Sequence, residues 1–149
     1  MAGAVILTLK GPNACVVTYF MRKKILIVED NAELLRLLLL NFKAAGFAIA
    51  TATDGIDALK KARSVSPDCI LLDLVLPELD GIAVCEILRQ DTETASVPIL
   101  MFTGLGGEFT RLAGLDAGAN DYITKPLSPK DLVSRIKELL RLSPEATLA

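Results

Sequence analysis

Three carboxylates, one hydroxyl and one ammonium group follow short apolar runs that are typical of buried parallel strands. In a parallel α/β sheet the carboxyl ends of the strands meet at one edge, and ligands bind in the crevice outside them. We therefore expect these side chains to share one rim of the domain. They are Glu29 and Asp30 after the first strand, Asp73 at the end of the third, Thr103 after the fourth and Lys125 after the fifth.

Such a group of carboxylates suits a hard divalent cation. Two carboxylates about 4 Å apart repel by about 4 kcal/mol at an effective dielectric constant of about 20, which favours a bound cation or a protonated carboxyl group. Ligation by oxygen, without His or Cys, indicates Mg²⁺ before Ca²⁺. A lysine beside a magnesium ion and a nucleophilic carboxylate is the equipment for phosphoryl transfer. The small Gly104 would leave the approach to Asp73 open.

Each of these residues, taken alone, also has a structural explanation. Asp30 could cap the helix that follows it, with Glu33 three residues later completing a capping box. Asp73 could be a strand-end acid that faces water, Lys125 a solvated turn residue and Thr103 an ordinary β-branched strand residue. The set is more specific than any member, because such polar groups follow every predicted strand except the second.

An alternation of strands and helices must position these groups. Apolar or alternating runs predict strands over 25–28, 47–51, 69–73, 97–102 and 121–124. Helical spacing predicts helices over 31–45, 55–64, 82–89, 108–117 and 128–142. The fourth of these helices contains Gly114, which costs about 1 kcal/mol relative to alanine and makes that helix weak. This pattern indicates a doubly wound α/β domain with a parallel sheet.

The overall composition excludes several classes of function. The chain has 149 residues, and its 16 basic and 18 acidic side chains give a net charge of −2, which argues against a surface built to bind nucleic acid or an anionic membrane. It has no histidine, so imidazole-dependent catalysis and His-ligated zinc are excluded. The three cysteines have no CxxC spacing and fit reduced thiols.

The first 21 residues differ from the rest of the chain. They are apolar, but the segment Lys10–Asn13 interrupts them, so we expect neither a signal peptide nor a continuous helix. We expect 1–21 to be a dispensable extension or a mis-assigned start, 22–142 to be the folded domain and 143–149 to be a tail. That leaves no room for a further domain, so the chain is either a single-domain protein or one domain of a longer one.

Four segments together resemble the receiver domain of two-component response regulators. They are KKILIVEDN with Glu29 and Asp30, PDCILLDLVLPELDG with Asp73, PILMFTG with Thr103, and GANDYITKPL with Lys125. The resemblance covers about residues 22–142. It implies a flavodoxin-like fold with strand order 2-1-3-4-5. It also implies a single-domain regulator of the chemotaxis type, or a receiver cut from a longer DNA-binding regulator.

The resemblance further implies roles for individual residues. Asp73 resembles the aspartate that accepts a phosphoryl group from a phosphohistidine. Glu29, Asp30 and Asp73, with the backbone carbonyl of Val75, resemble the ligands of Mg²⁺.

Four more residues resemble the phosphoryl-binding and switch positions of the family. Thr103, next to Gly104, resembles the hydroxyl that moves to the phosphoryl group, and Tyr122 resembles the aromatic residue that swings inward behind it. Lys125 resembles the lysine that pairs with a phosphoryl oxygen, and its bond to Pro126 is expected to be cis.

The resemblance implies a regulatory protein rather than an enzyme, with chemistry limited to its own phosphorylation and dephosphorylation. Its expected partners are a sensor histidine kinase or a histidine phosphotransfer protein, and a downstream protein target. The signal, and a possible homodimer, would use the face formed by 108–117, 121–124 and 128–142. We expect no direct contact with nucleic acid or a membrane, and a cytoplasmic location.

Two classes of function remain open on the sequence alone. The first is a phosphorylation-controlled signalling module, and the second is a scaffold or adaptor that keeps the fold but ignores phosphate. A phosphatase with an aspartate nucleophile would ordinarily need a second Asp where Val75 stands. The glycines after Thr103 lack the third glycine of a GxGxxG nucleotide loop.

Overall fold

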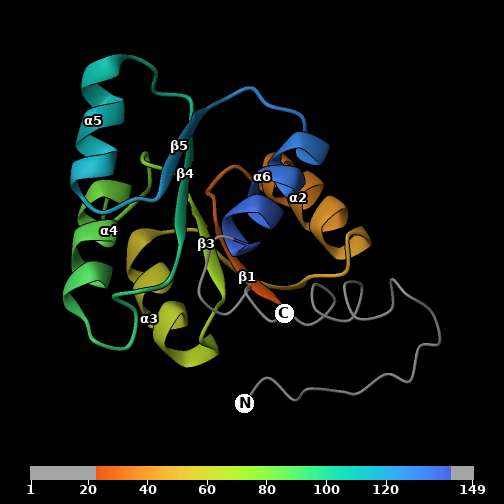
Figure 1. The fold of residues 1–149 in the computed structure, drawn as a ribbon, viewed down its shortest axis with the longest axis horizontal. Helices are drawn as coiled ribbons and strands as arrows, with labels where there is room; N and C mark the ends of the chain where they lie inside the picture. The colour runs from red at the N-terminus through yellow and green to blue at the C-terminus, as the bar shows by residue number, and fades with distance from the viewer. Residues whose placement is uncertain (1–22, 142–149) are drawn as a thin grey trace.

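The computed structural model describes residues 23–141 as one parallel sheet between two layers of helices (Figure 1). The strands are β1 (Lys24–Val28), β2 (Ala48–Ala52), β3 (Cys69–Leu72), β4 (Ile99–Thr103) and β5 (Asp121–Thr124). The helices are α2 (Ala32–Ala44), α3 (Gly55–Val65), α4 (Gly81–Gln90), α5 (Glu108–Asp116) and α6 (Pro129–Arg141). The strand order β2-β1-β3-β4-β5 confirms the predicted doubly wound, flavodoxin-like α/β fold.

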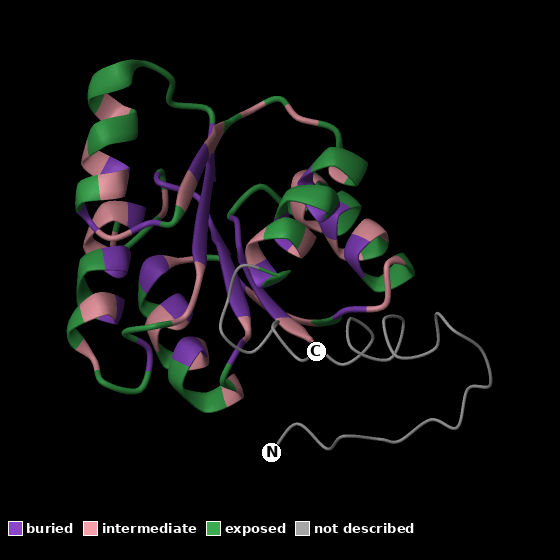
Figure 2. Ribbon diagram, viewed as in Figure 1, coloured by how far each residue is buried: buried purple, intermediate pink, exposed green. Residues whose placement is uncertain are grey.

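Each face of the sheet has its own hydrophobic core. Helices α3, α4 and α5 cover one face, and α2 and α6 cover the other (Figure 1). Successive residues of a strand point to opposite faces, so Met101 enters the first core while its neighbours Leu100 and Phe102 enter the second. The central strands are therefore buried on both sides, which explains their continuous apolar runs (Figure 2).

Side-chain caps set where four of the helices begin. Asn31, Asp54, Asp80 and Ser128 each accept a hydrogen bond from the backbone N–H three residues later, at 2.7 to 3.2 Å. These bonds satisfy donors that a helix N-terminus leaves without partners. The interpretation of Asp30 as the cap of the first helix is wrong, because Asn31 is the cap. The exposed Asp30 carboxylate is thus left at the strand end, outside the helix cap.

Helix α3 packs on the sheet as its spacing predicts, except at one residue. The apolar pattern places Ile56, Leu59 and Ala62 in the core. Ala62 is buried and Leu59 packs against the core, whereas the Ile56 side chain is 43% exposed. A Cβ built on Gly55 would lie 2.0 Å from the Leu79 carbonyl oxygen. The close backbone approach at this glycine therefore orients the helix by its small residues.

The structure describes residues 23–141, and the predicted domain bounds, 22–142, stay a prediction. The predicted extension over 1–21 and the tail over 143–149 lie outside the described residues. Within residues 23–141 every helix is too short or too polar to span a bilayer.

Candidate functional site

The ends of β1, β3 and β5 bring Glu29, Asp73 and Lys125 into direct contact. Lys125 Nζ donates hydrogen bonds to Glu29 Oε1 at 2.6 Å and to Asp73 Oδ2 at 2.9 Å. The two carboxylates come from neighbouring strands, whose pairing continues past β3 as the Asp73 N–H donates to the Val28 carbonyl. One ammonium group therefore joins two carboxylates that lie 44 residues apart in the sequence.

Both carboxylates are almost completely buried. Glu29 is 2% exposed and Asp73 is 6% exposed. Their second oxygens are also engaged, because the Asn31 N–H donates to Glu29 Oε2 at 3.1 Å and the Val75 N–H donates to Asp73 Oδ1 at 3.3 Å. Each carboxylate is thus held by one backbone N–H and by Lys125, as buried charges require.

Asp30 completes a cluster of three carboxylates. One oxygen from each of Glu29, Asp30 and Asp73 lies within 4.8 Å of the others. This all-oxygen donor set, with one exposed member, fits a hard divalent cation such as Mg²⁺ that keeps part of its water shell. The role of the Val75 carbonyl as a fourth ligand stays a prediction, although the Val75 N–H already contacts Asp73.

Burial and charge change the acidity of two of these groups. Burial raises the pKa of Glu29, and the charge of Asp73 adds to this, against the hydrogen bonds from Lys125 and Asn31. Burial alone would lower the pKa of Lys125, but the hydrogen bonds and charges of Glu29 and Asp73 raise it. Lys125 therefore remains an ammonium ion, and the buried Glu29 carboxylate is costly to ionise without a second cation.

We predict that Glu29→Gln stabilises the metal-free protein relative to wild type, by an amount that grows as the pH rises from about 4.5 toward neutrality. The folded-state pKa of Glu29 lies above its ordinary value of 4.5, so protonation of Glu29 stabilises the folded state relative to the unfolded state. This contribution to the free energy of unfolding is complete below pH 4.5 and is lost as the pH rises through the folded-state pKa. Glutamine stays neutral throughout. Urea unfolding of both proteins at several pH values, in the presence of a chelator, measures the difference.

Glu33→Gln at the exposed surface of α2 is the matched control for the loss of one negative charge. A Glu29→Gln stability difference that stays constant, or shrinks, as the pH rises would contradict this account of the buried carboxylate.

Thr103 and Tyr122 are linked to each other through the backbone of Leu105. The Leu105 N–H donates to Thr103 Oγ1 at 3.3 Å, and the Tyr122 hydroxyl donates to the Leu105 carbonyl. Thr103 is fully buried and Tyr122 is 9% exposed. A movement of the Thr103 hydroxyl would therefore break a contact with the same peptide segment that holds the Tyr122 ring.

The glycine inside α5 allows this arrangement. A Cβ built on Gly114 would lie 2.7 Å from Met101 Sδ and 3.0 Å from Tyr122 Cδ2. The glycine predicted only to weaken this helix thus lets α5 pack closely on β4 and β5. Gly104 is different: a Cβ there would meet none of the described atoms within 4 Å, so the space beside it is open.

The backbone on either side of Lys125 has a defined geometry. The Lys125 N–H donates to the Thr103 carbonyl at 2.7 Å, and the Lys125–Pro126 peptide bond is cis, the geometry that the resemblance implies. The Lys125 ammonium also lies over the ring of Phe102, 5.5 Å from its centroid. Phe102 and the Leu105 backbone were not identified from the sequence, because Phe102 has the pattern of a core residue and Leu105 takes part only through its peptide groups.

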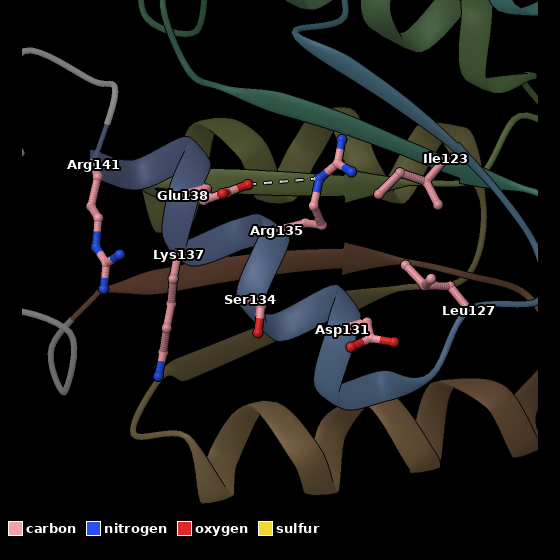
Figure 3. Close-up of a pocket in the computed structure, with 8 residues that line it drawn as sticks. All are labelled: Ile123, Leu127, Asp131, Ser134, Arg135, Lys137, Glu138 and Arg141. Atoms are coloured by element: carbon pink, nitrogen blue, oxygen red, sulfur yellow. Dashed lines mark ion pairs between the residues drawn. The ribbon is translucent and has the colours of Figure 1, made fainter.

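A hollow of about 500 Å³ lies elsewhere, between β5 and the outer side of α6 (Figure 3). Charged side chains line most of it, including Arg135 and Glu138, which form an ion pair at 4.0 Å. None of the three clustered carboxylates lines this hollow, so it is separate from the site described above.

Comparison with known proteins gives a consistent result. The family model described as response regulator receiver domain matches residues 25–137. The chain is 48% identical over 123 residues to the alkaline phosphatase synthesis transcriptional regulatory protein PhoP of Bacillus subtilis, which covers 83% of this chain and 50% of the relative. It is 42% identical over 118 residues to the DNA-binding dual master transcriptional regulator RpaA of Synechocystis, covering 79% and 49%.

A solved structure is similar over the whole domain. The beryllofluoride-activated N-terminal receiver domain of RstA from Klebsiella pneumoniae has a TM-score of 0.75 and 31% identity, covering 80% of this chain and 99% of that domain. The chain spans about half the length of the curated relatives it matches.

Proposed function

This chain belongs to the response regulator receiver domain family, and on that basis we propose that it accepts a phosphoryl group on Asp73 and so controls the binding of a partner. The observation that carries the proposal is the buried Asp73 carboxylate, which shares Lys125 with Glu29 and lies beside Asp30. A scaffold that ignored phosphate would gain nothing from three clustered carboxylates, which repel one another.

The reaction transfers the phosphoryl group from a phosphohistidine of a kinase or phosphotransfer protein. One carboxylate oxygen of Asp73 forms a bond to phosphorus as the phosphorus–nitrogen bond breaks, and the leaving imidazole takes up a proton from water. This explains how a chain without histidine can act in such signalling. Bound at Glu29, Asp30 and Asp73, Mg²⁺ would supply positive charge to the phosphoryl oxygens.

Two donors of the chain are placed to receive the phosphoryl group. Lys125 already donates to Asp73 Oδ2, so its ammonium can pair with a phosphoryl oxygen after a small shift. Phosphorylation adds a charge of about −1.5 to −2 and three acceptor oxygens, which would draw the Thr103 hydroxyl away from the Leu105 N–H. The Leu105–Tyr122 contact would then rearrange, and α5 with it.

The proposed output surface is the face of α5, β5 and α6. Leu105, Phe109 and Leu112 expose large apolar side chains on or next to α5, and Phe109 is 87% exposed. A rearrangement of the Leu105 segment would change this apolar surface, which suits recognition by a downstream protein or by a second copy of the chain.

The relatives favour a second form of the proposal. PhoP and RpaA are named as transcriptional regulators, and each is about twice as long as its match to this chain. The domain would then be the phosphorylation-controlled part of a DNA-binding regulator, with the same chemistry at Asp73. In either form we propose a cytoplasmic regulatory protein, whose chemistry is confined to its own phosphorylation and dephosphorylation.

The proposal is tested by incubating the protein with a small phosphodonor such as phosphoramidate and following intact mass. We expect one phosphoryl group per chain when Mg²⁺ is present and essentially none in excess chelator. Asp30→Asn should strongly reduce the Mg²⁺-dependent uptake, because it removes an exposed ligand without touching the helix cap at Asn31. An unmodified wild-type mass at saturating donor and Mg²⁺ would overturn the proposed function.

Mg²⁺ binding has its own readout that does not depend on phosphorylation. A ligand at 100 times its dissociation constant stabilises the folded state by about 2.7 kcal/mol, so Mg²⁺ should raise the wild-type melting temperature. The Asp30→Asn protein should show a much smaller increase. Equal increases in both proteins would contradict the metal site.

A further inference from the structure

The aromatic ring of Phe102 lies next to the ammonium group of Lys125. The Lys125 ammonium is over the Phe102 ring, 5.5 Å from its centroid, within the distance at which a cation is attracted by an aromatic face. Phe102 itself is 3% exposed and belongs to the core on the α2 and α6 side. The ammonium group therefore makes hydrogen bonds to Glu29 and Asp73 and also contacts the aromatic ring of Phe102.

The strand register explains why the ring lies there. Leu72 of β3 pairs with Met101 of β4, so the next residues, Asp73 and Phe102, lie side by side at the end of the sheet. Phe102 pairs with Ile123 on its other side, and Lys125 follows two residues later, with the same orientation to the sheet. Phe102 thus belongs to the strand between the one that precedes the proposed phosphoryl acceptor and the one that precedes the lysine proposed to bind the phosphoryl group.

We propose that Phe102 is a positioning residue for phosphoryl transfer, acting through a cation–π contact that holds the Lys125 ammonium beside Asp73. This inference rests on the proposed function. A lysine side chain has four flexible carbons and three rotatable donors. Hydrogen bonds to the two carboxylates alone therefore leave the position of its ammonium group partly free. The ring face supplies a further attractive surface for the ammonium.

A purely structural role would make different demands on residue 102. The core needs an apolar side chain of about the size of Phe102, which leucine approaches and a fluorinated phenylalanine provides almost without change of shape. A cation–π contact needs electron density on the ring face, which each fluorine atom reduces. Volume and electron density can therefore be separated by experiment.

The test replaces Phe102 by mono-, di- and trifluorinated phenylalanine in the 149-residue chain and measures the rate of phosphoryl uptake from phosphoramidate with Mg²⁺. We expect a graded decrease that reaches about fivefold for the trifluorinated ring, and a decrease of about five- to tenfold for Phe102→Leu. Phe102→Tyr, which keeps an electron-rich ring, should stay close to wild type. A flat rate across the fluorinated series would overturn the inference.

The matched control is the same fluorinated series at Phe42. This residue is fully buried in the same core and pairs with Phe47, at 5.7 Å between ring centroids. Its fluorination should leave the uptake rate unchanged. An equal decrease at Phe42 would show that fluorination acts through the core, and the inference would fail.

A second measurement needs neither metal nor phosphodonor. The ring face of Phe102 should shift the ε-methylene proton resonances of Lys125 upfield in the metal-free protein, and Phe102→Leu should remove the shift. If wild type takes up phosphate but this shift and the fluorine trend are absent, Phe102 has no positioning role. If the shift is present and wild type takes up no phosphate, the proposed function has failed and the contact with Lys125 stands alone.

Discussion

Phosphoryl uptake is expected to disappear completely when Asp73 is replaced by asparagine. An amide oxygen is a poor nucleophile, and the substitution also removes one of the three carboxylates proposed to hold Mg²⁺. The fold should survive, because asparagine has the same size and can still accept the Val75 N–H bond. Intact mass after incubation with a small phosphodonor and Mg²⁺ measures the result directly.

Asp116→Asn is the matched control for this substitution. It changes the same chemical group on the exposed surface of α5 and should leave uptake at the wild-type level. Stability provides a second check, because Asp73→Asn removes a negative charge beside the buried Glu29 and should not lower the free energy of unfolding greatly. Retention of one phosphoryl group per chain in Asp73→Asn would assign the acceptor to another residue.

The general position of the site could be predicted from the sequence because parallel strands all end at one edge of the sheet. Glu29, Asp73 and Lys125 are far apart in the chain, yet each directly follows or ends an apolar run, and that alone places them on one rim. The fold class followed from the same alternation of strands and helices. The contacts between the three groups could not be predicted, because they depend on strand order and register.

The parts that the sequence missed depend on where the folded backbone places each residue. Asp30 and Asn31 are both good helix caps, and only the observed start of α2 shows that Asn31 is used. Ile56 fits the apolar pattern of α3, but the backbone contact at Gly55 turns it outward. Phe102 has the pattern of any core residue, and only the strand order and register show that its ring lies next to the Lys125 ammonium.

Lys125→Met is expected to have the second-largest effect, and it should act on both stability and phosphorylation. Methionine keeps an unbranched apolar chain above Phe102 but removes the ammonium from two nearly buried carboxylates. Breaking a buried ion pair by removing one partner costs about 3 kcal/mol or more, because the remaining charge is left uncompensated. Urea unfolding of the metal-free protein near neutral pH should show a loss of this order.

The rate of phosphoryl uptake should fall by about 100- to 1,000-fold in Lys125→Met, the usual effect of losing one donor to a developing charge. This decrease should persist at saturating Mg²⁺, since the metal does not supply the lysine's hydrogen bond. Uptake within a few-fold of wild type would show that Lys125 is needed for the metal-free structure and not for the transfer.

A double variant separates the two effects of Lys125. Glu29→Gln removes the carboxylate that burial and Asp73 make hard to ionise, so the Glu29→Gln, Lys125→Met protein should regain most of the stability lost in Lys125→Met alone. The coupling between the two substitutions measures the ion pair, because the residues are in contact at 2.6 Å. The uptake rate should not recover in the double variant, since the lysine's contact with Asp73 is still missing. If stability and rate recovered together, Lys125 would act only by balancing the charge of Glu29, and its proposed contact with the phosphoryl group would be wrong.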